Sequence, residues 1–433
     1  MYRDPVSASQ HSNAFTAGQF ACAPPKLPNK NWHDLPAVTL ECRWVDDLDE
    51  LIGLIPAWKR LAECCLCPNV FYEPQLLIPA WKHLREGNVR VAVVQAAERA
   101  QPGAPKVLCG MLPLEIRRTT FGLPLRSAKL WQHVHCFLTT PLIRSDVASE
   151  TWAKFVDFLA HDAEGVSILN LPFVPAEGHF QHALVDFLRT SDLTWQQRDI
   201  FRRALFVRKA NEGAFCDEWP RKRRHELNRL ERRLEESGKL LIEEFDVGDD
   251  AEQFADQFLA LEAMGWKGLE GTAMAKNEAH SRFLKEAMTE LASENRLMGL
   301  TMRLNGTPIA MKTNFLTHNG GFAFKICFHP EWAKFSPGAI LEKINVSKLH
   351  ETDRVQWMDS CAVPDHPMIN TLWPERRMLQ SLSIATGGVA SRVAVGAIPL
   401  MKQARDTVRT VVSRCRDAWR ARGEASSLRC GVN

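Results

Sequence analysis

Apolar and polar residues follow a mixed helix-and-strand pattern in the first half of the chain. VTLECRWV (38–45) alternates as a strand does, and apolar residues at helical spacing then predict helices. Three further strands follow, one of them over 130–137, and helices and strands then alternate up to residue 207. The helices are predicted over 48–61, 73–86, 149–163 and 177–189, and the strands over 38–45, 89–95, 107–117, 130–137, 166–171 and 195–207.

The second half shows the same order of elements. Two helices precede a hairpin whose arms are joined by Asn305-Gly306, and both residues of this dipeptide tolerate the positive φ of a tight turn. Helices are predicted over 251–264, 278–294, from Pro337 onward and over 375–385, and strands over 296–304, 308–316, 321–328, 354–358 and 391–397. The pattern therefore predicts two α/β (α+β) domains of related topology.

Composition shifts divide the chain into five segments. Residues 1–36 are rich in Ser, Ala, Asn and Pro and lack periodicity, which is typical of a disordered leader. We expect a first domain over 37–210, a basic linker helix over 211–240 and a second domain over 241–398. Residues 399–433 are expected to form a basic amphipathic helix and tail. We expect that helix to pack against the rest of the protein, and peripheral contact with an anionic membrane surface is the alternative.

Charge and cysteine usage narrow the class of protein. The 54 basic and 51 acidic residues give a net charge of +3, which provides no reason to expect a specific nucleic-acid partner. Cys64 and Cys67 form the one CxxC spacing, and no second pair completes a zinc site. His133 and His135 lack a nearby carboxylate spacing, so no metal is expected. Without a signal-peptide pattern or an 18-residue apolar run, we expect a cytoplasmic protein.

The most basic stretch, 219–239, holds eight Lys or Arg residues against four Glu. Leu227, Leu230 and Leu234 recur at helical spacing, which predicts an amphipathic helix with a positive outer face. Three interpretations remain open: a linker helix docked by its leucines, a positive wall beside a phosphate-bearing ligand, or a nucleic-acid contact.

A strand, a loop and a helix start occur together over 320–350. Ser336-Pro337-Gly338 opens the helix; proline suits a first helical turn, and glycine lets a ligand approach the backbone. The N–H groups at such a helix start favour a pyrophosphate. The corresponding place in the first half has Asp146 and Glu150 but no glycine, so a single phosphate-binding element per chain is expected.

Several blocks together resemble the GNAT-type N-acyltransferases, in particular the CelD-like acetyltransferases of cellulose biosynthesis, which are related to the FemABX peptidyltransferases. The blocks are NVFYEPQLLIPAW (69–81), KRRHELNRLERRLEESGKL (222–240), FLALEAMGWKGLEGTA (258–273), FAFKICFHPEWAKFSPGAILEKI (322–344) and MDSCAVPDHPMINTLWPERR (358–377). The resemblance implies tandem GNAT-like domains, each with a mixed, mostly antiparallel sheet flanked by helices. In this family the acyl-CoA loop carries several glycines, whereas here only Gly338 is present.

The resemblance implies the cofactor-binding residues, and position along the chain suggests the catalytic and acceptor-binding candidates. Asp359 and His366, at and after the end of a strand, are the candidate catalytic groups. Trp266, Lys267, Arg376 and Arg377 are candidates for binding the acceptor. The candidates for binding acyl-CoA are Phe324, Lys325, Ile326, Lys334, Phe335, Ser336, Pro337, Gly338 and Ala339.

The expected activity is transfer of an acyl group from acyl-CoA, with acetyl-CoA as the default donor, to a small-molecule or glycan-linked amine. By resemblance this reaction would serve cell-envelope or exopolysaccharide biosynthesis. Two alternatives stand beside it. One is an aminoacyl-tRNA-dependent transferase of the FemABX kind, with the basic helix as the contact. The other is a non-catalytic scaffold of a polysaccharide-assembly system.

Overall fold

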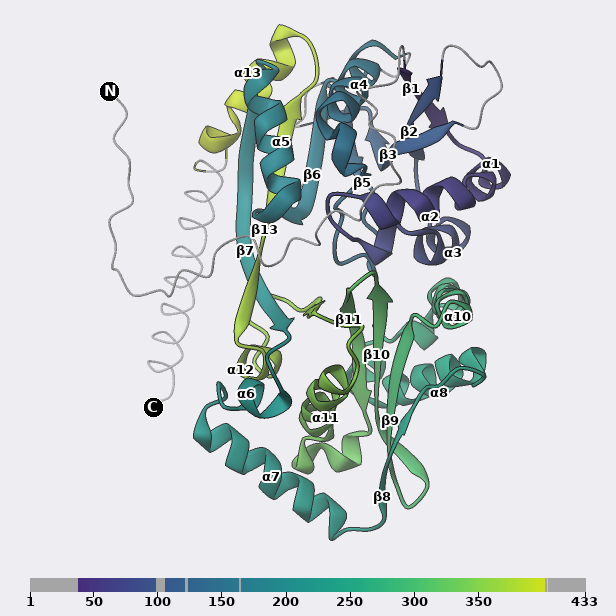
Figure 1. The fold of residues 1–433 in the computed structure, drawn as a ribbon, viewed down its shortest axis with the longest axis vertical. Helices are drawn as coiled ribbons and strands as arrows, with labels where there is room; N and C mark the ends of the chain where they lie inside the picture. Colours follow the sequence, from purple (N-terminus) through teal and green to yellow (C-terminus); the bar gives the residue numbers. More distant parts are fainter. Residues whose placement is uncertain (1–37, 99–105, 121–123, 163–164, 402, 404–433) are drawn as a thin grey trace, which may run out of the picture.

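A computed structural model describes residues 38–98, 106–120, 124–162, 165–401 and 403. The strands of this part of the chain form one continuous sheet that runs through both halves (Figure 1). Its order is β1-β2-β3-β4-β6-β13-β7-β12-β11-β10-β9-β8, with β5 paired to β3. The leader 1–36 and most of the predicted C-terminal helix lie outside the described residues. In the described part, no helix is long and apolar enough to cross a membrane.

The two halves share one topological unit. Antiparallel strands lead to a parallel partner, β4 to β6 in the first half and β11 to β12 in the second. The strands of the first half are β1 (Val38–Val45), β2 (Val89–Glu98), β3 (Val107–Arg117), β4 (Ser127–Leu130), β5 (Leu142–Ile143) and β6 (Ile168–Pro175). Those of the second are β8 (Leu240–Glu244), β9 (Leu297–Leu304), β10 (Thr307–Thr317), β11 (Gly320–Phe328) and β12 (Trp357–Asp359). The predicted tandem of mixed, mostly antiparallel sheets is confirmed.

Two long strands join the halves. β7 (Trp195–Val207) pairs with β13 (Glu375–Ala385) over most of its length and with β12 through its last three residues. β13 in turn lies between β7 and β6, so the last strand of the chain returns to the sheet of the first half. Figure 1 shows both strands running from one half into the other. The two halves therefore share backbone hydrogen bonds as well as a core.

Helices cover both faces of the sheet. In the first half they are α1 (Leu48–Gly53), α2 (Ile55–Cys64), α3 (Pro74–His83), α4 (Ala148–His161) and α5 (Gly178–Thr190). In the second they are α6 (Glu212–Cys216), α7 (Arg221–Glu235), α8 (Ala251–Met264), α9 (Trp266–Leu269), α10 (Glu278–Ser293), α11 (Pro337–Glu351), α12 (Ile369–Leu372) and α13 (Val389–Gly396). Short 3₁₀ turns are η2 (Val70–Tyr72), η3 (Ser145–Val147), η4 (Met274–Lys276) and η5 (Pro330–Phe335).

The two faces of β11 meet different helices. The Cys327 thiol lies beside the Phe258 carbonyl of α8, whereas Ile326 and Phe328 face Gly338 of α11. This alternation follows from the two-residue period of a strand. At the domain junction, the Phe71 ring of η2 packs on Phe322 of β11, with the ring centroids 5.3 Å apart.

Two predicted elements are wrong in type. Residues 375–385, predicted as a helix, form β13, and the predicted strand 391–397 lies within α13 apart from Ala397. β13 has a strand on each side, and its Leu379, Leu382 and Ile384 side chains are fully buried in the core on the faces of the sheet. A buried strand reads as an apolar run, which periodicity does not distinguish from a buried helix.

The strand predicted over 130–137 is also too long and misplaced. β4 ends at Leu130, and the chain then continues as a loop that carries His133 and His135. Asn305 and Gly306, in contrast, form the predicted tight turn between β9 and β10, with φ values of 50° and 86°.

Candidate functional site

A bulge interrupts β11 at Phe324. Thr313 of β10 pairs with Lys325, and the next residue, Asn314, pairs with Ala323, so Phe324 is the extra residue. A bulge of this kind turns the local backbone and re-aims the side chains beside it. It places Phe324 and Lys325 at a point where the strand changes direction.

β11 and β12 separate just before this bulge. They pair in parallel through Gly320–Phe322 and Trp357–Asp359, and their ladder ends there. From residue 323 to 328, the edge of β11 that faces away from β10 has no strand partner among the described residues. Unpaired backbone N–H and C=O groups at such an edge are available to a ligand.

A cavity of about 250 Å³ lies along this open edge. Its walls come from residues 326–328 of β11, from Gly265 between α8 and α9, from Trp266, Lys267 and Leu269 of α9, and from Pro330 and Ala333 of η5. Phe328 contributes its carbonyl, which lies 3.7 Å from the position that a Cβ on Gly265 would take. Trp266 is 58% exposed at the rim. The cavity is a mostly apolar slot beside backbone groups, and we call it the β11 slot.

Two charged side chains, Glu262 and Lys267, line the β11 slot, and a third, Lys325, lies beside Glu262. The Glu262 carboxylate is fully buried and accepts from the Lys267 ammonium at 2.8 Å and from the Met274 N–H at 2.9 Å. The Lys325 ammonium lies 3.8 Å from the same carboxylate. Burial raises the pKa of Glu262, but Lys325 and Lys267 together hold it below its ordinary value. Burial and the neighbouring Lys267 lower the pKa of Lys325 to about 8.

The helix start predicted to bind a phosphate has an unusual first turn. Ser336 adopts a left-handed conformation (φ 52°, ψ 51°) that ends η5 and begins α11. Its carbonyl accepts from the N–H groups of Ala339 and Ile340. Pro337 has no N–H group. The Gly338 N–H is therefore the one amide of this turn without a backbone hydrogen bond among the described residues. A Cβ at Gly338 would meet Phe328 at 3.4 Å, which is an ordinary van der Waals contact, so packing against the sheet does not by itself require glycine there.

The basic helix α7 lies beside this turn. Leu227, Leu230 and Leu234 are buried, and α7 packs on α11 and η5. The Arg233 guanidinium lies over the Phe335 ring at 5.8 Å, and Lys334 lies over the same ring at 5.0 Å. Phe335 itself is buried, so it supports the turn from below. The leucine-docked helix is therefore confirmed, and the positive wall beside a phosphate-bearing ligand stays a prediction.

Asp359 lies where β11 and β12 separate, and it is completely buried. The Arg203 guanidinium of β7 contacts it at 2.6 Å, and the Arg377 guanidinium of β13 contacts it at 2.9 Å. Burial raises the pKa of Asp359, but the two arginines hold it below its ordinary value. Arg377 also donates to the Cys67 sulfur at 3.3 Å. The cluster ties β7, β12 and β13 to the first half.

The other two candidates near Asp359 lie in the loop after β12. His366 is half-buried and accepts from the Ile369 N–H at 3.3 Å, and burial lowers its pKa. Arg376 donates to the carbonyls of Asn370, Trp373, Pro374 and Glu375, so it holds the loop around α12 together.

Sequence reasoning missed Glu262, Gly265 and Arg203. A signal existed for Glu262, because it is one helical turn beyond Phe258 on the apolar stripe of α8. A carboxylate at such a position is buried and needs partners. Arg203 pairs with Asp359 across 156 residues, and no local pattern reveals that contact.

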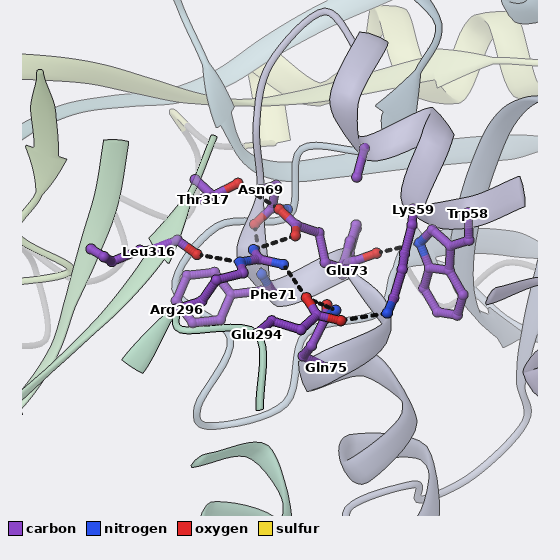
Figure 2. A network of polar contacts seen from close by, with 12 residues as sticks. Trp58, Lys59, Asn69, Phe71, Glu73, Gln75, Glu294, Arg296, Leu316 and Thr317 are labelled. Carbon is purple, nitrogen blue, oxygen red and sulfur yellow. Dashed lines mark hydrogen bonds and ion pairs between the residues drawn. The ribbon is translucent and has the colours of Figure 1, made fainter. Parts of the chain in front are cut away.

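A polar network fastens the two halves together at a second cavity of about 400 Å³ (Figure 2). Arg296 donates to the Leu316 carbonyl at 2.9 Å and forms ion pairs with Glu73 and Glu294. Glu73 is buried and also accepts from the Thr317 hydroxyl at 2.6 Å. Because the carboxylates of this network are paired, we assign the network a structural role, which is to hold the two halves together.

Removing Arg296 is expected to loosen that junction. Arg296→Ala would leave the buried Glu73 carboxylate without its cation and lower the free energy of unfolding by about 3 kcal/mol. Chemical denaturation measures this change. Arg282→Ala is the matched control, because its ion pair with Glu278 is exposed, and no measurable change is expected. Equal effects of the two substitutions would contradict the fastening role.

Known proteins share parts of this sequence and of this fold. The model of the acetyltransferase (GNAT) domain family matches residues 221–360, which include α7, the β11 slot and Asp359. No curated protein sequence matches the chain significantly. Among solved structures, FemX has a TM-score of 0.51 at 8% identity, covering 79% of this chain and 96% of FemX. The similarity to FemX shows likeness of fold alone.

Two further structures are similar at lower scores. The tandem GNAT protein from the clavulanic acid biosynthesis pathway has a TM-score of 0.41 at 13% identity, covering 80% of this chain and 99% of its own. The C-terminal domain of a putative lysylphosphatidylglycerol synthetase from Agrobacterium fabrum has a TM-score of 0.43 at 12% identity, covering 66% and 83%. In the described part of the chain, no group of three or more His, Cys, Asp or Glu side chains could hold a metal ion.

Proposed function

We propose that this chain, an acyltransferase of the GNAT superfamily whose GNAT domain spans residues 221–360, transfers an acyl group from acyl-CoA to an amine. The CelD-like branch and a place in envelope or exopolysaccharide biosynthesis stay predictions. The observation that carries the proposal is the bulged, open edge of β11 with a slot beside it. It offers unpaired backbone groups, an apolar channel and a cation at one point.

The β11 slot suits the extended arm of an acyl-CoA. Such an arm carries amide groups, which pair with the open strand edge at 326–328, and methylene groups, which pack on Trp266 and Leu269. At the η5 end of the slot, the Gly338 N–H, Lys334 and the basic face of α7 supply a positive field for phosphates. Of the cofactor-binding candidates in the 322–344 block, Ile326 lines the slot, and the others stay predictions.

The reacting carbonyl belongs at the bulge, beside Lys325. When an amine attacks a thioester, negative charge develops on the carbonyl oxygen, and a desolvated ammonium stabilises it. Lys325 is mostly buried and follows the bulged residue Phe324 directly. The amine must lose a proton, and the leaving thiolate must gain one. His366 and Asp359 stay candidates for those roles, and positioning supplies part of the rate.

The test is equilibrium titration with acetyl-CoA and longer acyl-CoAs. We expect one site per chain in the wild-type protein. Gly265→Leu would extend a side chain toward the Phe328 carbonyl and fill the β11 slot, so binding should weaken about tenfold or more.

Gly396→Leu is the control, because a Cβ at that position meets nothing within 4 Å. It should bind as the wild type does. Two equivalent sites per chain, or unchanged binding by Gly265→Leu, would contradict the proposed location.

A second candidate donor is an aminoacyl-tRNA, and the exposed face of α7 favours it. Arg221, Lys222, Arg229 and Arg232 all point to solvent. Binding of tRNA through them would be steeply salt-dependent. A gel shift with tRNA that exceeds the shift with DNA of equal length would support this donor. Equal shifts that vanish together as salt rises would mark α7 as a nonspecific contact.

A further inference from the structure

Three imidazoles gather on the side of Lys325 that faces the first half. His133 and His135 come from the loop after β4, and His280 comes from α10. The ring centroids of His135 and His280 are 4.8 Å apart, and those of His135 and the bulge residue Phe324 are 6.3 Å apart. The loop of the first half therefore reaches the bulge of the second.

His135 is buried without a hydrogen-bond partner. Its side chain is 5% exposed, it stacks on Phe283 at 5.5 Å, and neither ring nitrogen has a partner among the described residues. Nearly all buried polar groups in proteins are paired, so an unpaired imidazole needs an explanation. A ligand that pairs with these nitrogens is one.

The charge beside the imidazoles is also unbalanced. Lys325 and Lys267 share the single carboxylate of Glu262. With neutral imidazoles, the two lysines and Glu262 carry one net positive charge, and the further carboxylate that acts on His280, Glu86, is exposed to solvent. Burial and the nearby Lys325 lower the pKa of His135 to about 2, so that imidazole is neutral at working pH. A buried excess charge is costly unless an anion pairs with it.

We propose that His135, His280 and Lys325 bind the carboxylate of the acceptor, which makes the acceptor an amino acid or a peptide with a carboxylate close to its amine. One carboxylate balances the excess charge, whereas a phosphate dianion would exceed it. The Phe283 and Phe324 rings contact the His135 ring from two sides and so fix its orientation. The inference rests on the proposed function, which places the reacting carbonyl at the same bulge and so requires a short link between carboxylate and amine.

Binding of a matched pair of probes tests this assignment. L-alanine and L-alaninamide both carry the amine, and only alanine carries the carboxylate. Isothermal titration without any acyl donor should give binding of alanine that is at least about tenfold tighter than that of alaninamide. Because no donor is present, failure of acyl-CoA binding would overturn the proposed function and leave this result intact.

His135→Phe separates a ligand-binding role from a structural one. Phenylalanine keeps the stack on Phe283 and lacks the nitrogens, so the protein should stay folded while alanine binding weakens about tenfold. His161→Phe, at an exposed position, should bind as the wild type does. Equal binding of the two probes, unchanged binding by His135→Phe, or no binding of alanine, glutamate or alanyl-alanine would each overturn the assignment.

Discussion

Replacing Lys325 by methionine is expected to slow acyl transfer about 10²- to 10³-fold, which is the usual cost of removing one group that stabilises an oxyanion. Methionine has a similar length, so the contact with the Phe324 ring is kept while the ammonium is lost. Acyl-CoA binding through the β11 slot should change little. Steady-state kinetics at saturating donor and acceptor would show the loss in kcat, whereas loss of the Lys325 contact with the acceptor carboxylate would appear as a raised KM for the acceptor.

The pH profile provides a second readout of the same prediction. Because the protonated form of Lys325 is the one that stabilises the oxyanion, the rate should decline as pH rises above about 8, where Lys325 loses its proton. This decline of the rate at high pH should be absent in Lys325→Met. Lys276→Met, at an exposed lysine of η4, is the control and should leave the profile unchanged. A wild-type rate in Lys325→Met would remove the oxyanion role.

Asp359→Ala is expected to lower the free energy of unfolding by about 3–5 kcal/mol. The substitution would leave the Arg203 and Arg377 guanidinium groups buried without an anion, at the point where three strands meet. Chemical denaturation measures the change. Asp157→Ala, whose carboxylate is 61% exposed, is the control and should have little effect. A similar stability of the two variants would show that the cluster does not hold β7, β12 and β13 together.

The same cluster predicts a direction for acid sensitivity. The pKa of Asp359 is lower in the folded protein than its ordinary value of 3.8, so the unfolded chain takes up this proton first as pH falls. The stability that Asp359 contributes is therefore fully present above about pH 4 and is lost as pH falls through its folded pKa. Asp359→Ala should lack this part of the acid dependence.

Local patterns were sufficient for most of the fold. The Asn305-Gly306 turn, the full extent of α8 and the full extent of β7 follow from turn chemistry and periodicity. The strand, loop and helix start around Pro337 is likewise a local signal, and the structure places it beside an open strand edge.

The rest depends on contacts that are distant in sequence. β13 was read as a helix because its burial comes from β6 and β7, about 200 residues earlier. His133 and His135 were placed on one face of a predicted strand with no ligand expected, since nothing near them in sequence shows that α10 and β11 pack around them. The unpaired state of His135 and the excess charge at Lys325 are visible only in the assembled junction.

Hydrogen–deuterium exchange with and without saturating acetyl-CoA tests the central claim most directly. The account predicts slower exchange of the backbone amides at 323–328, at Gly265 and α9, and at Gly338, because these groups line the path assigned to the donor. The first half, where β4 and β6 form the corresponding parallel pair, should show no such protection. Protection at β4 and β6 instead of β11, or no protection anywhere at saturating acetyl-CoA, would contradict the account.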